Sequence, residues 1–177
     1  MKAPDPESQV RIDSYDPEWP ARFEQEREAL EKLLGNGLTG GIHHVGSTSV
    51  PGLAAKPVID ILVGVKDLDA ARSYINPLAA LDYMYAPYRP EEMVWFCKPN
   101  PVHRTHHLHL VPADSARFRA ELAFRDHLRA NPDIAEEYVA LKRKLAREFK
   151  RDREAYTEAK ADFIGTVLRR ARSDADG

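Results

Sequence analysis

Apolar residues along this chain repeat first with helical and then with strand spacing. Between residues 16 and 37 they recur at mostly helical spacing, with Pro17 near the start and Gly35 past the end, which predicts a helix. The stretch 56–65 is apolar on both faces apart from Asp60, the pattern of a central strand covered on two sides. Further strands are predicted at 40–46, 82–88, 93–99 and 105–112.

The remaining apolar pattern is helical. Asp67 caps a predicted helix over 67–81. Three more helices are predicted at 114–131, 132–150 and 153–171. A helix, a small mixed β-sheet and a helical C-terminal region together predict an α+β fold. A chain of 177 residues suits one domain, which we expect over 13–172, with flexible tails at 1–12 and 173–177.

Charge and composition exclude several classes of protein. The chain has 26 Lys and Arg against 28 Asp and Glu, and a net charge of −2 argues against nucleic acid or a membrane surface as a partner. A basic run over 142–153 favours a solvated helix face, with phosphate contacts as the alternative. Cys97 is the one cysteine, so an intramolecular disulfide is excluded. No stretch approaches the roughly 20 apolar residues of a membrane span, and we expect a cytoplasmic protein.

Asp60 is the first candidate for chemistry. A carboxylate inside an apolar strand loses hydration, which costs several kcal/mol unless the group is hydrogen-bonded, ion-paired or bound to a cation. Asp60 is therefore either a structural aspartate that accepts hydrogen bonds from a loop, or part of a metal or substrate site.

Two histidines strengthen the second interpretation. His107 and His109 lie two residues apart on a predicted strand, so both rings project from one face, whereas His106 projects from the other. Together with Asp60 they would form a set of two histidines and one carboxylate, which suits a divalent transition metal. The alternative is a pair of imidazoles that hydrogen-bond to carboxylates or backbone without an ion.

A turn rich in hydroxyl groups precedes the Asp60 strand. It consists of Gly46, Ser47, Thr48 and Ser49. A glycine lets the backbone approach a ligand closely, and hydroxyl and N–H groups can bind phosphate oxygens, although the same sequence also forms ordinary turns. Lys56 either supplies positive charge for that phosphate or pairs with Asp60, and Arg104 is a second source of charge.

Four long segments identify a family resemblance. They are HHVGSTSVPGLAAKPVIDILV, RTHHLHLV, FRDHLRANPDIAEEYVALKRKLA and REAYTEAKADFI. In this order, and over roughly residues 13 to 172, they resemble the GrpB family, whose domain is also found fused to some bacterial dephospho-CoA kinases. The resemblance implies a nucleotidyltransferase-like fold in which a small mixed sheet carries the site.

The resemblance also implies roles for residues of this chain. In that superfamily a Gly-Ser turn, two carboxylates one residue apart and a third on a later strand hold two magnesium ions and a nucleotide. Gly46 and Ser47 match the turn and Asp60 matches the first carboxylate, whereas Leu62 stands at the second position. The later strand matches the one that carries the two histidines.

This departure changes the expected metal. Two neutral imidazoles and one aspartate suit a single softer ion, such as Zn²⁺, Mn²⁺, Fe²⁺ or Ni²⁺, better than a magnesium pair. His44, close to the turn, is either a third imidazole ligand, a general base or a hydrogen-bonded core histidine.

These observations predict a protein of the nucleotidyltransferase superfamily. It would bind a nucleotide or a phosphorylated small molecule at a divalent metal ion, magnesium or a transition metal, held by Asp60, His107 and His109, and could catalyse nucleotidyl transfer. The alternatives are a non-catalytic accessory module associated with the coenzyme A pathway, or a metal-dependent hydrolase.

Overall fold

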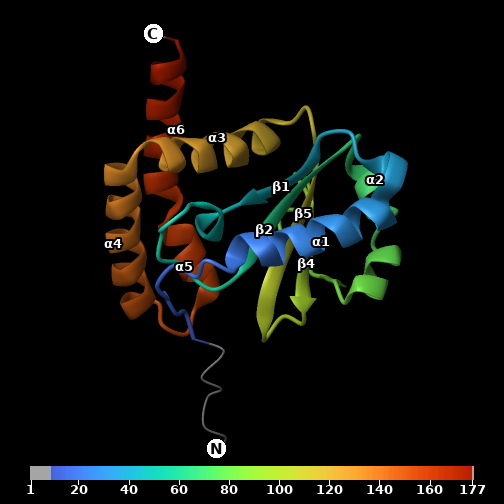
Figure 1. Ribbon diagram of the computed structural model, residues 1–177, viewed down its shortest axis with the longest axis horizontal. Coiled ribbons are helices and arrows are strands. Elements are labelled where there is room, and N and C mark those ends of the chain that lie inside the picture. The colour runs from blue at the N-terminus through green and yellow to red at the C-terminus, as the bar shows by residue number, and fades with distance from the viewer. Residues whose placement is uncertain (1–8, 177) are drawn as a thin grey trace, which may run out of the picture.

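A mixed β-sheet of five strands forms the centre of the protein (Figure 1). The computed structural model describes residues 9–176. The strands are β1 (Gly41–Val45), β2 (Ile59–Val65), β3 (Met84–Tyr85), β4 (Val94–Pro99) and β5 (Arg104–Pro112). They lie in the order β1-β2-β5-β4-β3, and β2 and β5 run parallel while the other neighbours are antiparallel.

Six α-helices accompany the sheet in the described residues. They are α1 (Trp19–Leu34), α2 (Leu68–Arg72), α3 (Ala116–Ala130), α4 (Pro132–Glu148), α5 (Arg153–Ala159) and α6 (Ala161–Ala175). Short 3-10 turns occupy Gly35–Gly37, Ser47–Ser49 and Pro77–Leu81. Helix α1 crosses one face of the sheet, and α4, α5 and α6 gather on the side away from α2 (Figure 1).

The alternation of side chains along β2 separates two layers of core. Ile59, Ile61 and Val63 face α1, where they join a large apolar cluster with residues such as Trp19 and Leu30. The intervening positions face the opposite side. Leu62 packs there with residues from β1, β4, β5 and α3 in a second cluster, of Val45, Met93, Trp95, Cys97, Val111 and Phe118. Asp60 shares this second face, which α3 covers in part.

The α+β architecture is confirmed, and two helices differ from the sequence prediction. The helix expected over 67–81 begins as predicted, with the Asp67 carboxylate accepting a hydrogen bond from the N–H of Ala70. It ends at Arg72, and Pro77, which has no N–H to donate, starts a separate 3-10 turn. The last predicted helix divides at Lys160, whose N–H bonds the Thr157 carbonyl in a tighter turn.

Near both chain ends the structure describes features within the predicted tails: a packed residue at the N-terminal end and a continuing, exposed helix at the C-terminal end. Val10 is buried against Leu145 and Tyr156, and its N–H donates to the Lys150 carbonyl. At the other end α6 continues through Ala175. Residues 1–8 and 177, which belong to the predicted tails, lie outside the described residues. No helix within residues 9–176 is long and apolar enough to cross a membrane.

Candidate functional site

The structure brings Asp60, His107 and His109 together on one face of the sheet. In the parallel pairing of β2 with β5, Asp60 lies opposite His107 and Leu62 lies opposite His109. The Oδ1 atom of Asp60 is 3.0 Å from Nδ1 of His107 and 3.8 Å from Nε2 of His109. His106 points to the other face, where its Nε2 is 3.9 Å from Glu26 at α1.

Asp60 and His107 form a hydrogen-bonded pair. Burial alone would raise the pKa of Asp60, but the hydrogen bond from His107 and the nearby His109 ring outweigh burial and hold that pKa far below its usual value. Burial lowers the pKa of His107 to about 4, so its ring is neutral at pH 7. The ionised Asp60 carboxylate is an acceptor, and therefore Nδ1 of the neutral ring carries the proton. The other nitrogen, Nε2, is buried without a hydrogen-bond partner and can accept one from a ligand.

His109 is charged, in contrast to His107. Burial would lower its pKa, but the nearby charges of Glu121 and Asp60 and the hydrogen bond with Glu121 raise it to about 9. Its Nδ1 is 3.3 Å from the Glu121 carboxylate, which Arg117 holds at a further 3.3 Å. Glu121 and Arg117 lie on α3, and no spacing rule in the sequence connected that helix to the histidine strand. The site therefore includes a carboxylate that sequence reasoning missed.

This placement does not fit a metal ion shared by the three side chains. The two ring nitrogens of an imidazole diverge, so an ion on Nε2 of His107 cannot also contact the Asp60 oxygen that accepts from Nδ1; that carboxylate orients the ring instead. Within residues 9–176, no three His, Cys, Asp or Glu side chains are arranged to hold an ion. Metal binding stays a prediction that would require at least one ring to turn.

The Gly46–Ser47 turn lies directly beside Asp60. Gly46 has a φ of 71°, and a Cβ atom built on it would lie 2.5 Å from the Asp60 Oδ2. Only glycine fits this close approach of the turn to the carboxylate. The Ser47 side chain lies next to the Tyr138 side chain of α4, so the turn adjoins the C-terminal helices. These two residues lie where the prediction put them, at the edge of the site.

The other residues of the turn have hydroxyl groups that face inward. Thr48 donates to the Val58 carbonyl at 3.0 Å, and Ser49 donates to the Gly46 carbonyl. Both side chains are buried, so their hydroxyls hold the turn together and are not placed to bind phosphate. His44 is also not part of the group: it lies opposite Ile61 on the α1 face, and its Nε2 is 2.9 Å from the Thr48 hydroxyl. The alternative of a hydrogen-bonded core histidine describes His44.

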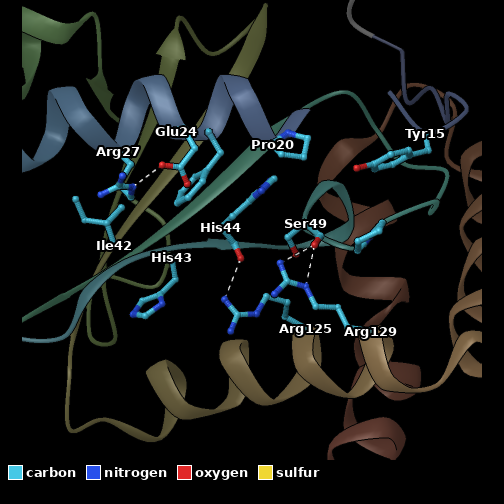
Figure 2. A pocket seen from close by; sticks show the side chains of 12 residues that line it. Tyr15, Pro20, Glu24, Arg27, Ile42, His43, His44, Ser49, Arg125 and Arg129 are labelled. Atoms are coloured by element: carbon cyan, nitrogen blue, oxygen red, sulfur yellow. Dashed lines mark hydrogen bonds and ion pairs between the residues drawn. The ribbon is translucent and has the colours of Figure 1, made fainter. Parts of the chain in front are cut away.

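A cavity of about 360 Å³ lies apart from Asp60, between α1 and α3 along β1 (Figure 2). Arg125 and Arg129 rise from α3 toward β1 and the turn (Figure 2). Arg125 donates to the His44 carbonyl at 3.2 Å, and Arg129 donates to the Ser49 carbonyl through two nitrogens at 3.0 and 2.8 Å. Arg129 thus connects the turn to α3, and Arg125 connects β1 to the same helix.

Three lysines, one before β2 and two from the C-terminal helical region, lie near two tyrosine rings beside the site. Lys56 and Lys160 lie over the ring of Tyr156, with ammonium-to-centroid distances of 5.4 and 4.5 Å. Lys142 lies 4.8 Å from the centroid of Tyr138 and donates to the Ala54 carbonyl at 2.6 Å. Burial lowers the pKa of Lys56 and of Lys160 to about 8, while the charge of Asp60 acts in the opposite sense on both.

Lys142 corrects the interpretation of the basic run as a solvated face. Arg143, Arg147 and Arg151 are exposed as expected, but Lys142 is 1 % exposed. The signal was present in the sequence, because Lys142 falls four residues after Tyr138 and three before Leu145 on the buried stripe of α4.

A second cavity, of about 280 Å³, adjoins the site. Its lining includes His107, Lys56, Arg104 and Arg153. Arg104 also lies over the ring of Trp95, 5.4 Å from its centroid. Neither Lys56 nor Arg104 forms an ion pair with a carboxylate within residues 9–176. Their positive charges therefore face this cavity without a neutralising partner in the described residues.

Comparisons with known proteins show the family of this chain. The family profile described as "GrpB protein" matches residues 9–170. The chain belongs to the GrpB family. It is 40 % identical over 171 residues to the UPF0157 protein PA4798 of Pseudomonas aeruginosa, covering 93 % of this chain and 69 % of that protein. The crystal structure of GrpB from Enterococcus faecalis has a TM-score of 0.84 at 33 % identity, covering 94 % of this chain and all of that one.

Two further similarities extend beyond GrpB proteins. A dephospho-CoA kinase of Mycolicibacterium paratuberculosis is 31 % identical over 193 residues, and the match covers 94 % of this GrpB chain but about half, 47 %, of the kinase. The GLD-2/RNP-8 complex has a TM-score of 0.55 at 13 % identity, over 88 % of this chain and 59 % of that one. The fold is therefore nucleotidyltransferase-like.

Proposed function

We propose that this GrpB protein binds a nucleotide or another phosphorylated small molecule on the sheet face that carries Asp60. The observation that carries the proposal is that the side chains of Lys56, Arg104 and Lys160, near this aspartate, have no carboxylate partners within residues 9–176. Lys56 and Arg104 line the adjoining cavity with His107, and Lys160 lies across Tyr156 from Lys56. Partly buried positive charge without carboxylate partners is stabilised by an anionic ligand, and lysine and arginine bind phosphate through charge-assisted hydrogen bonds.

The nucleotidyltransferase-like fold and the kinase among its relatives support this ligand class. The side chains do not favour transfer through two magnesium ions, because Leu62 stands where the superfamily has a second carboxylate and His109 lies beside it on β5. Binding without turnover, as an accessory module for coenzyme A metabolism, is the form of the proposal closest to these residues.

The experiment is a thermal-shift and calorimetric titration with ATP, ADP and AMP, each in EDTA and again with Mg²⁺, Mn²⁺ or Zn²⁺. We expect at least one nucleotide to raise the melting temperature of the wild type, since a ligand that binds only the folded state stabilises it by mass action. Lys56→Met should weaken that ligand about tenfold, and Lys66→Met, at an exposed lysine, should not. No shift with any nucleotide under any of these conditions would overturn the proposal.

Hydrolysis at the same site is the second candidate, favoured by the Asp60–His107 pair. A carboxylate on Nδ1 fixes the tautomer of a neutral imidazole and leaves Nε2 as an acceptor, the arrangement in which histidine serves as a general base. Phosphate release from ATP should then be measurable and should fall at least a hundredfold in His107→Gln, while nucleotide binding is retained. Equal rates in the two proteins would exclude this activity.

A further inference from the structure

Three lysines that are distant in sequence converge on two tyrosine rings. Lys56 precedes β2, Lys142 lies on α4, and Lys160 joins α5 to α6. We call these residues the lysine cluster. Lys56 and Lys160 contact the Tyr156 ring, and Lys142 contacts the ring of Tyr138. Ser47, in the turn beside Asp60, lies next to Tyr138, so the lysine cluster adjoins the Gly46–Ser47 turn.

The lysine cluster carries positive charge that the protein does not neutralise. None of its ammonium groups forms an ion pair with a carboxylate in the part of the chain that the structure describes. Lys142 is almost wholly buried, and the hydrogen bond it donates is to the Ala54 carbonyl. Cation–π contacts with tyrosine offset only part of the desolvation of an ammonium group. The lysine cluster therefore costs stability until an anion reaches it.

Electrostatic repulsion among the three lysines also indicates that the cluster lowers the stability of the protein when no anion is bound. Burial, together with the charges of Lys160, Arg143 and Lys56, lowers the pKa of Lys142 to about 7. An anion bound among the three would reverse that repulsion and favour the fully protonated cluster.

The charge of the cluster indicates what the ligand carries. A single phosphate group has a charge of at most about −2 at neutral pH, whereas a diphosphate or triphosphate has about −3 or −4. Three ammonium groups without carboxylate partners in the described residues match the larger anions better than a single phosphate. In the superfamily, magnesium ions held by carboxylates share this role, but here the carboxylate set does not fit a shared ion.

We infer that the lysine cluster binds a chain of two or more phosphates, and that it supplies the counter-charge without a divalent metal ion. This inference rests on the proposed function, because it assigns the phosphate chain of the proposed ligand to Lys56, Lys142 and Lys160. The ligand class is thus a diphosphate or triphosphate ester, in preference to a monophosphate.

The test is isothermal titration of the metal-free protein with inorganic phosphate, pyrophosphate and tripolyphosphate in EDTA. We expect pyrophosphate and tripolyphosphate to bind at least tenfold more tightly than phosphate. Lys160→Met should weaken tripolyphosphate about tenfold or more, since it removes one charge-assisted contact. Lys144→Met, at an exposed lysine on α4, is the matched control and should bind like the wild type.

A second variant guards against effects on folding. Lys142→Met removes a buried charge, and we expect it to fold, as judged by circular dichroism, and to lose tripolyphosphate affinity as Lys160→Met does. Binding that needs Mg²⁺ or Mn²⁺, equal affinities for phosphate and pyrophosphate, or an unchanged Lys160→Met would overturn the inference and leave the proposed function intact. If neither nucleotides nor inorganic phosphates bind, with or without metal, the proposed function fails as well.

Discussion

His44 illustrates how one buried hydrogen bond fixes the state of a side chain. The Thr48 hydroxyl donates its proton to the Val58 carbonyl, so it can only accept from Nε2 of His44. His44 must therefore carry a proton on Nε2. Its ring stacks on Phe23 with centroids 4.8 Å apart, and burial lowers the pKa of His44 to about 4. The folded protein thus contains the neutral ring at pH 7.

Because the pKa of His44 is lower in the folded protein than in the unfolded chain, the free energy of unfolding should decrease as the pH is lowered. In the unfolded chain His44 titrates near 6.5, so between pH 6.5 and 4 the unfolded state binds a proton that the folded state does not. Stability present above pH 6.5 is lost across this window, by about 3 kcal/mol for the shift involved. Urea denaturation of wild type and His44→Gln at pH 7 and 4.5 measures the difference. The variant keeps an amide donor and should lose less stability on acidification; parallel curves would contradict the assignment.

Gly46 makes a second prediction for a single residue. Alanine there would have to adopt a positive φ and place its Cβ within 2.5 Å of the Asp60 carboxylate. We expect Gly46→Ala to lower the free energy of unfolding by about 2 kcal/mol and to weaken nucleotide binding. Gly52→Ala is the control, since its φ is also positive, at 79°, but its Cβ would meet open space. If both variants bind nucleotide like the wild type, the turn does not shape the site.

At the scale of elements, Arg129 connects α3 to the turn beside the site. Its two hydrogen bonds to the Ser49 carbonyl are charge-assisted, and together they should contribute about 1.5–3 kcal/mol. Arg129→Ala should therefore lower the melting temperature measurably, while Arg143→Ala, on the exposed face of α4, should not. Scanning calorimetry compares them. Equal melting temperatures would indicate that the turn holds its shape without α3.

Periodicity in the sequence predicted the elements better than it predicted their contacts. Side-chain alternation predicted that His107 and His109 share one face of their strand. The parallel register of β2 with β5 was not predictable, and it is this register that places Asp60 opposite His107 on the same face of the sheet. Glu121 could not be found in the same way, because helical spacing relates residues within α3 and not across it to β5. Lys142 was predictable from its spacing but was misjudged because lysine is rarely fully buried.

At the scale of the whole molecule, the N-terminal segment forms part of the wall of the cavity beside the site. Gln9 and Arg11 line the cavity that Lys56 and His107 share, and Val10 is 5 % exposed among Leu145 and Tyr156. The sequence pattern did not predict this segment as structured, because a single apolar residue among polar ones carries no periodic signal.

Truncation tests the role of this segment. A chain that begins at residue 13 loses the burial of Val10, about 1.5–3 kcal/mol, and its melting temperature should fall by about 5 °C or more. A chain that begins at residue 9 keeps the packing of Val10 and should melt at a higher temperature than the shorter chain. It should also bind nucleotide more tightly than the shorter chain, because Gln9 and Arg11 line the cavity. Identical melting curves for the two truncations would contradict the packing of Val10.

The residues next to Ser47 and Asp60 also determine at which stage of protein synthesis the site can form. Asp60 contacts a histidine 47 residues later, Tyr138 on α4 lies next to Ser47, and Lys160 is among the last residues before the final helix. A nascent chain that has completed only the sheet therefore lacks the part of the site that α4 and Lys160 contribute. If the proposed ligand binds there, it can bind only after the helices that follow Pro132 have emerged, so a nascent chain stalled before them should not bind it.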